Sequence, residues 1–327
     1  MQASNLFNGY IGSHVCYHLG KTGVLELFTN HENVNLRTIH NSLLTESHPE
    51  WADTLITFGI KCGIFKKLRE DQLALTQLGQ DIKKNIGFFI WAVGGYGELF
   101  RKYPYQIAAE EEDCHAFVDG GNVAQGSRLA NQSFMWDIIT TEFRRHTVKR
   151  VADLGSGNAG ALISLCKAFP EATGIGIDVS AKAIDEAQRN ILSHGLQERI
   201  KLYNQNVLHA VDDPVLQQRF ARADTLMTFM MMHDLFNIED PIWVLQKLRS
   251  TFPNVRKFLI ADTFISEEQS LSDESPIFVY GFEYVHSLMK IKLFRKSDYE
   301  NYFAAAGFTI MATHYLNVPN TYLFVLQ

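Results

Sequence analysis

Short apolar runs alternate with amphipathic segments from Lys149 onward, and this alternation constrains the fold more than any other feature of the chain. Apolar strands separated by helices predict a parallel, doubly wound α/β sheet. The last two runs must pair antiparallel, because a parallel crossover needs about a dozen residues and the link at 317–320 is far shorter. The sequence therefore predicts a Rossmann-like sheet that ends in an antiparallel strand pair. The expected strands are 149–155, 173–179, 200–207, 223–231, 257–264, 309–316 and 321–327.

The first 147 residues follow another pattern. Between residue 20 and about residue 80, apolar residues recur at helical spacing in three segments, and two short extended pieces follow the third. Three helices and a hairpin predict a winged helix. Residues 82–147 are mostly helical in pattern, aromatic and interrupted by glycines. We place domain boundaries after residues 85 and 147.

Composition excludes several functions. The net charge of −6 argues against binding to nucleic acid or to an anionic membrane surface. No apolar run is long enough to span a bilayer, which takes about 18 residues or more. The first residues lack the basic and apolar regions of a signal peptide, and the cysteines are widely separated, so we expect a cytoplasmic protein.

A glycine loop joins the first strand of the alternating region to its first helix. Gly155, Gly157 and Gly160 match G-x-G-x-x-G, a pattern that several nucleotide-binding folds share. Asp178, at the end of the next strand, suits the hydroxyls of a ribose. Asp153 suits an ammonium group and is out of place beside a pyrophosphate, which favours S-adenosylmethionine over a nicotinamide dinucleotide. We expect Asn206, after the third strand, to hydrogen-bond the adenine.

The residues VADLGSGNAG at 151–160 and GIGIDVS at 174–180 resemble the first two motifs of class I S-adenosylmethionine-dependent methyltransferases. The resemblance covers 149–327, although the family usually has Asp where Asn206 stands. The front part, with LALTQLGQDI at 73–82, resembles the dimerisation domain of small-molecule O-methyltransferases. It implies a homodimer with a dimerisation domain at 1–85, a helical linker and pocket roof at 86–147, and a cofactor-binding methyltransferase domain at 148–327. The expected cofactor-binding residues are Asp153, Gly155, Ser156, Gly157, Asp178, Val179, Asn206, Val207 and Phe229.

The fourth strand is expected to end in MMMHDLF, which puts His233 and Asp234 at the carboxyl edge of the sheet, where α/β enzymes bind their ligands. In plant-type O-methyltransferases a histidine here is the general base, a role for which the pKa of histidine is suited. Leu235 stands where those enzymes usually have Trp.

His286, on the helix after the fifth strand, adds a second histidine. Two histidines and a carboxylate suit non-haem iron and also accept zinc. On regular structure the adjacent His233 and Asp234 would diverge, so we expect a kink there. Arg128 would grip a substrate carboxylate, and Glu283, one helical turn before His286, is a reserve ligand or base.

This set resembles the metal-dependent α-keto acid β-carbon methyltransferases, of the phenylpyruvate and 2-ketoarginine type. The resemblance implies C-methylation of a small α-keto acid in the biosynthesis of amino acids or peptide antibiotics. The predicted metal ligands are His233, Asp234 and His286, and these with Arg128 are the predicted catalytic residues. Two alternatives stay open: a metal-free O-methyltransferase with His233 as the base, and a non-catalytic winged-helix ligand sensor.

Overall fold

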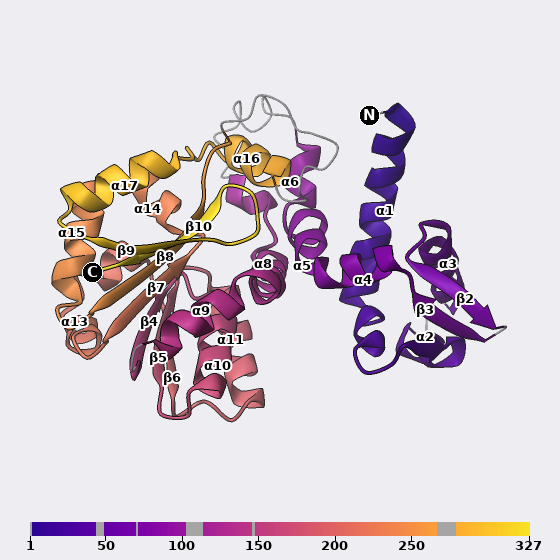
Figure 1. Ribbon diagram of the computed structural model, residues 1–327, viewed down its shortest axis with the longest axis horizontal. Coiled ribbons are helices and arrows are strands. Elements are labelled where there is room, and N and C mark those ends of the chain that lie inside the picture. The colour runs from indigo at the N-terminus through magenta and orange to yellow at the C-terminus, as the bar shows by residue number, and fades with distance from the viewer. Residues whose placement is uncertain (1, 44–48, 70, 103–113, 146–147, 267–278) are drawn as a thin grey trace.

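The protein is seen in a computed structural model that describes residues 2–43, 49–69, 71–102, 114–145, 148–266 and 279–327. Figure 1 shows a small N-terminal unit on the right, a large α/β unit on the left, and helices α5, α6 and α8 between them. In the part that is described, no helix is both long and apolar enough to cross a membrane.

The N-terminal unit is mostly helical with one small sheet, in the strand order β1-β3-β2. Helices followed by an antiparallel β2–β3 hairpin give the winged-helix arrangement that was predicted. Its elements are α1 (Ala3–Lys21), η1 (Leu25–Phe28), β1 (Asn33–Asn35), α2 (Leu36–Leu43), α3 (Pro49–Lys61), β2 (Phe65–Arg69), β3 (Gln72–Leu75) and α4 (Gln77–Lys84).

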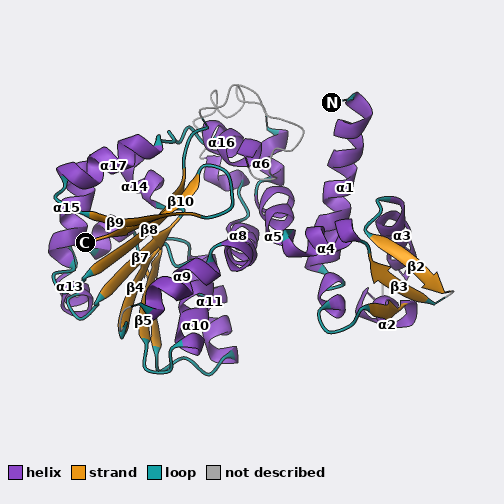
Figure 2. Cartoon of the chain, viewed as in Figure 1, coloured by secondary structure: helices purple, strands orange, loops and turns teal. Residues whose placement is uncertain are grey.

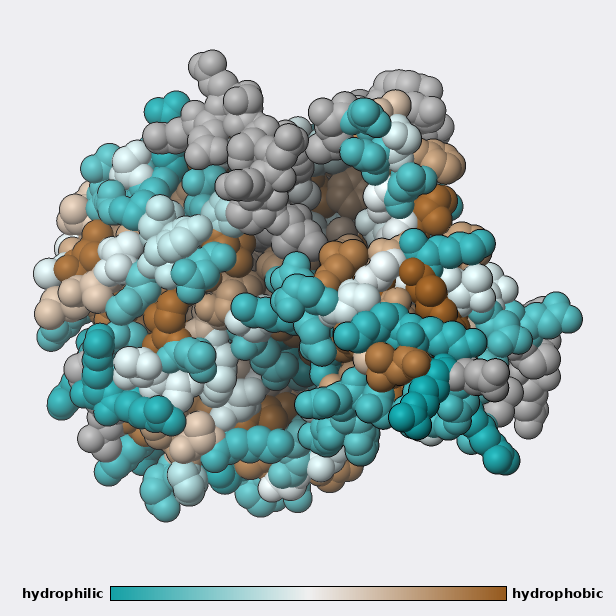
Figure 3. Space-filling view, turned by 45° about the vertical axis from the view of Figure 1, so that its right-hand side comes forward, coloured by the Kyte–Doolittle hydropathy of each residue, from teal (hydrophilic) through white to brown (hydrophobic). Residues whose placement is uncertain are grey.

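Helix α1 begins at Ala3, so it occupies a segment before residue 20 for which no secondary structure was predicted. Its apolar residues do not form one buried stripe: Leu6, Phe7 and Tyr10 are 63%, 68% and 58% exposed. Apolar patches also interrupt the hydrophilic surface on the right of Figure 3, where the N-terminal helices lie. A helix without a single core-facing stripe gives no periodic signal to read.

Helices of the connecting region cross very closely. It comprises α5 (Ile86–Phe89), the π-helix η2 (Ile90–Gly95), α6 (Gly97–Arg101), η3 (Cys114–Phe117), α8 (Gly120–Phe134) and α9 (Trp136–Arg144). A Cβ on Gly87 would lie 2.5 Å from the carbonyl oxygen of Gly126, and one on Gly126 would lie 2.5 Å from the Trp91 nitrogen. Glycine at both positions lets α8 pack against α5 and η2 and so lie across the α/β unit.

The α/β unit contains a seven-stranded sheet in the order β6-β5-β4-β7-β8-β10-β9. Its first five strands are parallel, and β10 pairs antiparallel with both β8 and β9 (Figure 2). The strands are β4 (Arg150–Leu154), β5 (Thr173–Asp178), β6 (Ile200–Asn204), β7 (Thr225–Phe229), β8 (Lys257–Thr263), β9 (Ile310–Tyr315) and β10 (Thr321–Leu326). The helices are α10 (Gly160–Ala168), α11 (Ala181–Ser193), α12 (Val207–Ala210), α13 (Pro214–Phe220), α14 (Met232–Ile238), α15 (Pro241–Thr251), α16 (Val279–Leu288) and α17 (Lys296–Ala305).

Apolar layers cover both faces of this sheet. One layer includes Phe220 of α13, Leu245 of α15 and Phe303 of α17, and the other includes Phe143 of α9 and Leu162 of α10. Burial on both faces explains why the central strands are continuously apolar. The predicted fold class is confirmed: a mostly helical N-terminal region precedes a Rossmann-like sheet with an antiparallel terminal pair.

Candidate functional site

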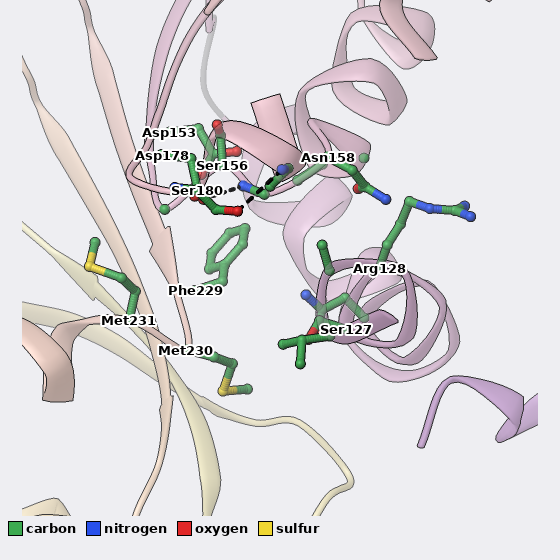
Figure 4. A pocket seen from close by; sticks show the side chains of 18 of the residues that line it. Ser127, Arg128, Asp153, Ser156, Asn158, Asp178, Ser180, Phe229, Met230 and Met231 are labelled. Carbon is green, nitrogen blue, oxygen red and sulfur yellow. Dashed lines mark hydrogen bonds between the residues drawn. The ribbon is translucent and has the colours of Figure 1, made fainter. Parts of the chain in front are cut away.

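A cavity of about 400 Å³ opens at the carboxyl ends of β4, β5 and β7, with α8 and α9 on its other side (Figure 4). Ligands of doubly wound folds bind at this edge. Most of the predicted site residues line it, from elements far apart in the sequence. They are Arg128, Asp153, Gly155, Ser156, Gly157, Asp178, Val179, Asn206, Val207, Phe229 and Asp234.

The glycine loop is shaped by positive φ angles and by Asp178. Gly155 and Gly157 have φ values of +75° and +53°, and a Cβ on Gly155 would lie 2.9 Å from Met231 Cγ. The Gly157 N–H donates to Asp178 Oδ2 and the Ser180 N–H donates to Asp178 Oδ1, each at 2.8 Å. The two bonds fix the plane of the Asp178 carboxylate at the cavity wall.

Asp153 is a carboxyl group in an unusual state. It is 3% exposed although it borders the cavity. Burial, and next the charge of Asp178, raise the pKa of Asp153 to about 8. Without a cation beside it, this carboxyl is therefore mostly neutral at pH 7.

Asn206 lies beyond the third strand rather than at its end. The strand stops at Asn204, and Asn206 caps α12 by accepting a hydrogen bond from the Leu208 N–H at 2.8 Å. The predicted strand to residue 207 is wrong in its last residues, because the side chain of Asn206 starts a helix instead. Its amide oxygen is committed to the cap.

Arg128 lies on α8 beside the glycine loop. A Cβ on Gly160 would overlap its Cγ and Cδ, so the arginine stem covers the start of α10. Its Nε is buried and has no hydrogen-bond partner in the described part of the chain. Burial lowers the pKa of Arg128, and the nearby Glu186 raises it. In Figure 4 its guanidinium lies to the right of Asn158 and points away from Asp178, Met230 and Met231.

His233 and His286 meet behind the cavity wall. They are 2% and 6% exposed, and their Nε2 atoms lie 3.0 Å apart. His286 Nδ1 lies 2.7 Å from the carbonyl oxygen of Phe282, which can only accept, so this nitrogen carries a proton. His233 Nδ1 lies 2.8 Å from Asp262 Oδ1 and likewise donates. In their neutral forms both histidines therefore turn an Nε2 lone pair toward each other.

Because two lone pairs at this distance repel each other, the contact between the Nε2 atoms is stable only with a cation or a proton between them. Burial lowers the pKa of His233, but the Asp262 charge and hydrogen bond outweigh it and raise that pKa to about 9. Burial, and next the charge of His233, lower the pKa of His286 to about 4. In the absence of any ion, His233 would hold the proton and donate it to His286.

The local chain path brings Asp234 toward the pair. β7 ends at Phe229, Met230 has a φ of +56°, and α14 begins at Met232, so His233 and Asp234 occupy the first turn of a helix. Asp234 Oδ1 lies 3.6 Å from His233 Nε2, and its side chain is 45% exposed. The expected kink is present, although the strand was expected to reach residue 231. Glu283, which was predicted as a reserve ligand or base, accepts a hydrogen bond from the Ser266 N–H at 2.6 Å.

Two residues of this network were not predicted. Asp262, at the end of β8, binds His233, and the Tyr299 hydroxyl of α17 donates to Asp262 Oδ2 at 2.7 Å. The position of Asp262 at the carboxyl end of a strand next to β7 was a usable signal, whereas nothing local marks Tyr299. Among the described residues, no cluster of three or more His, Cys, Asp or Glu side chains is arranged as a metal centre.

The α/β unit is similar to a known domain family. Residues 146–306 match the methyltransferase domain family. The matched segment contains the glycine loop and the five parallel strands of the Rossmann-like sheet, so this part of the chain is similar to methyltransferase domains.

Two curated relatives are similar over most of their length. Methyltransferase ungE' of Aspergillus campestris is 28% identical over 239 residues, which are 69% of this chain and 68% of the relative. Indolepyruvate C-methyltransferase of Streptomyces griseus is 27% identical over 258 residues, 79% of this chain and 74% of the relative. The crystal structure of human N-acetylserotonin methyltransferase has the same fold, with 14% identity, a TM-score of 0.65, and coverage of 99% of this chain and 96% of that one.

Proposed function

We propose that this methyltransferase transfers the methyl group of S-adenosylmethionine to the β-carbon of a small α-keto acid, with a metal ion held at the histidine pair. The observation that carries the proposal is the 3.0 Å approach of the Nε2 atoms of His233 and His286. Similarity to a curated indolepyruvate C-methyltransferase supports the substrate class.

The donor chemistry of the pair fits a metal. Metal-binding histidines usually donate their other ring N–H to a carboxylate or a backbone carbonyl. His233 donates to Asp262 and His286 to the Phe282 carbonyl, so both Nε2 lone pairs are available to one ion. Asp234 lines the cavity, and its Oδ1 lies 3.6 Å from His233 Nε2. These three residues would hold iron or zinc.

The reaction itself defines what the residues must do. A base takes a proton from the β-carbon of the keto acid, the resulting enolate carbon attacks the methyl group on the sulfonium, and S-adenosylhomocysteine departs. A bound metal ion supplies Lewis-acid stabilisation of the negative charge on the keto oxygen. Asp234 brings negative charge to the cavity side of His233, and the buried histidines keep water from this side of the substrate.

The cofactor residues have separate tasks in this proposal. Asp178, fixed by two backbone N–H groups, accepts the ribose hydroxyls, and Asp153 faces the ammonium group. Arg128 has a buried, unpartnered Nε beside the glycine loop, which supports binding of a carboxylate there. We therefore assign Arg128 to the carboxylate of the methionine part rather than to the keto acid. Asn206, Val207, Val179 and Phe229 would contact the adenosine.

O-methylation is the second candidate, favoured by the fold shared with solved O-methyltransferases such as the putative enzyme from Nostoc punctiforme, at a TM-score of 0.61. In that reaction His233 would remove a hydroxyl proton. The pKa of about 9 for His233 opposes this role, because the ring is protonated at neutral pH unless an ion displaces the proton.

One experiment separates the two candidates. The purified enzyme is incubated with methyl-labelled S-adenosylmethionine and a panel of aromatic and aliphatic α-keto acids, and the label is located in the product. We expect label on the β-carbon, loss of activity with a chelator, and recovery with Fe²⁺ or Zn²⁺. His286→Ala should lose bound metal and most activity while it keeps cofactor affinity. A chelator-resistant and fully active His286→Ala enzyme would contradict the metal proposal.

We also propose that the protein is a homodimer that uses the exposed apolar residues of α1, Leu6, Phe7 and Tyr10. A Phe7→Asp variant should become monomeric in sedimentation velocity, whereas Leu192→Asp, at a residue that is 66% exposed on α11, should not. A wild-type protein that sediments as a monomer at micromolar concentration would refute the dimer.

A further inference from the structure

We propose that Tyr299 is a positioning residue of the reaction centre, whose hydroxyl acts through Asp262 to decide which ring nitrogen of His233 faces His286. The inference rests on the proposed function in taking the histidine pair as the chemical centre. Tyr299 contacts neither the cavity nor the histidines' Nε2 atoms and therefore has no catalytic role of its own.

The Asp262 carboxylate is saturated with donors. Its Oδ1 accepts from His233 Nδ1 at 2.8 Å and from the Thr263 N–H at 2.9 Å. Its Oδ2 accepts from the Tyr299 hydroxyl at 2.7 Å and from the His233 N–H at 3.2 Å. A carboxylate offers about four acceptor sites, so each is used. The carboxylate can rotate only if several of these bonds break together.

The hydrogen bond from the Tyr299 hydroxyl to Asp262 Oδ2 is short, at 2.7 Å, and its donor lies on α17, away from both β8 and α14 in the sequence. Asp262 and Tyr299 are each 1% exposed, so bulk water does not compete with the hydroxyl for Asp262 in the wild-type protein. The Tyr299 ring packs edge-on against Phe236 and Phe264, with centroids 5.0 and 4.9 Å away. These contacts aim the hydroxyl, and phenylalanine at this position would keep them.

Loss of the hydroxyl would free one acceptor site in a dry environment. An unmet buried acceptor is unfavourable, so the carboxylate would turn to share its remaining donors or admit a water molecule. Either change weakens the His233 Nδ1–H bond that keeps Nε2 directed at His286. The direction of the His233 lone pair thus depends on a residue 66 positions beyond His233 in the sequence.

Tyr302 provides the matched control. It lies on the same helix and its ring contacts Phe236 at 5.8 Å, yet no hydrogen bond to its hydroxyl occurs within the described part of the protein. Tyr299→Phe and Tyr302→Phe therefore remove the same atom from two tyrosines of one helix that both contact Phe236, and only the first removes a bond to Asp262.

The test is a proton NMR measurement on the full-length wild-type protein and both variants, without cofactor or metal. A buried Nδ1–H bonded to a carboxylate gives a far-downfield, slowly exchanging resonance, which Asp262→Asn should abolish and so assign. We expect wild type and Tyr302→Phe to share it, and Tyr299→Phe to shift it upfield or broaden it by exchange. An unchanged resonance in Tyr299→Phe would overturn the proposal, even if its melting temperature falls.

Turnover provides the second readout. With the keto acid identified by the labelling experiment, kcat of Tyr299→Phe should fall about tenfold, the lower end for partners of a ligating histidine, while the Kd for S-adenosylmethionine stays the same. A wild-type kcat would also overturn the inference. If wild type methylates no keto acid, the proposed function fails, and the NMR comparison still decides the role of Tyr299.

Discussion

Replacement of Asp153 by asparagine should make the protein more stable and its cofactor binding weaker. Asp153 is 3% exposed and has a pKa raised to about 8, whereas an unfolded aspartate titrates near 3.9. Between about pH 4 and pH 8 the folded protein holds a proton that the unfolded chain has released, so stability falls as pH rises through this range. Asparagine has the shape of the neutral acid and avoids this loss.

The size of the effect follows from the shift. About 1.4 kcal/mol per pKa unit gives an upper limit near 4 kcal/mol at pH 7, since the folded group is still mostly protonated there. Cavity water reduces this limit, and we expect a gain of at least about 1 kcal/mol, or roughly 2 °C in Tm. Loss of the charged acceptor for the ammonium group should weaken S-adenosylmethionine binding by about 1.5–3 kcal/mol.

Thermal melts of the cofactor-free protein from pH 5 to pH 9, with calorimetric titration of S-adenosylmethionine, measure both effects. Asp262→Asn is the control, because Asp262 is equally buried but its hydrogen bonds and His233 lower its pKa. Its carboxylate adds stability above about pH 4, so this variant should be less stable at neutral pH. An Asp153→Asn protein that is less stable than wild type at pH 8, or that binds the cofactor with unchanged affinity, would refute the reasoning.

Three further substitutions test the cavity. Asp178→Ala should weaken S-adenosylmethionine binding by about 1.5–3 kcal/mol by calorimetry, and an unchanged Kd would argue against ribose recognition by this residue. Gly155→Val should abolish binding and lower Tm, because its φ is +75° and its Cβ would meet Met231 at 2.9 Å; wild-type binding would show that the loop adapts. Arg128→Gln should raise the Kd for S-adenosylmethionine while the KM for the keto acid stays constant. The reverse pattern would show that Arg128 binds the keto acid.

The cofactor-binding part of the site could be predicted from the sequence. Gly155, Asp153 and Asp178 belong to a contiguous loop and to strand ends, where local sequence dictates both conformation and position at the sheet edge. The ends of the strands were predicted less accurately. The third strand ends early because Asn206 caps a helix, and the fourth ends early because Met230 has a left-handed backbone conformation.

The doubly wound sheet, its antiparallel end and the glycine loop could be predicted from the sequence, because hydrophobic periodicity and turn residues act over a few neighbouring positions. The arrangement of the two histidines, in contrast, follows from long-range contacts. The 3.0 Å contact of His233 with His286 joins residues 53 apart, and the Asp262–Tyr299 bond joins residues 37 apart. Tautomers, lone-pair directions and pKa values depend on such contacts and on burial, and neither is encoded in the neighbouring residues along the chain.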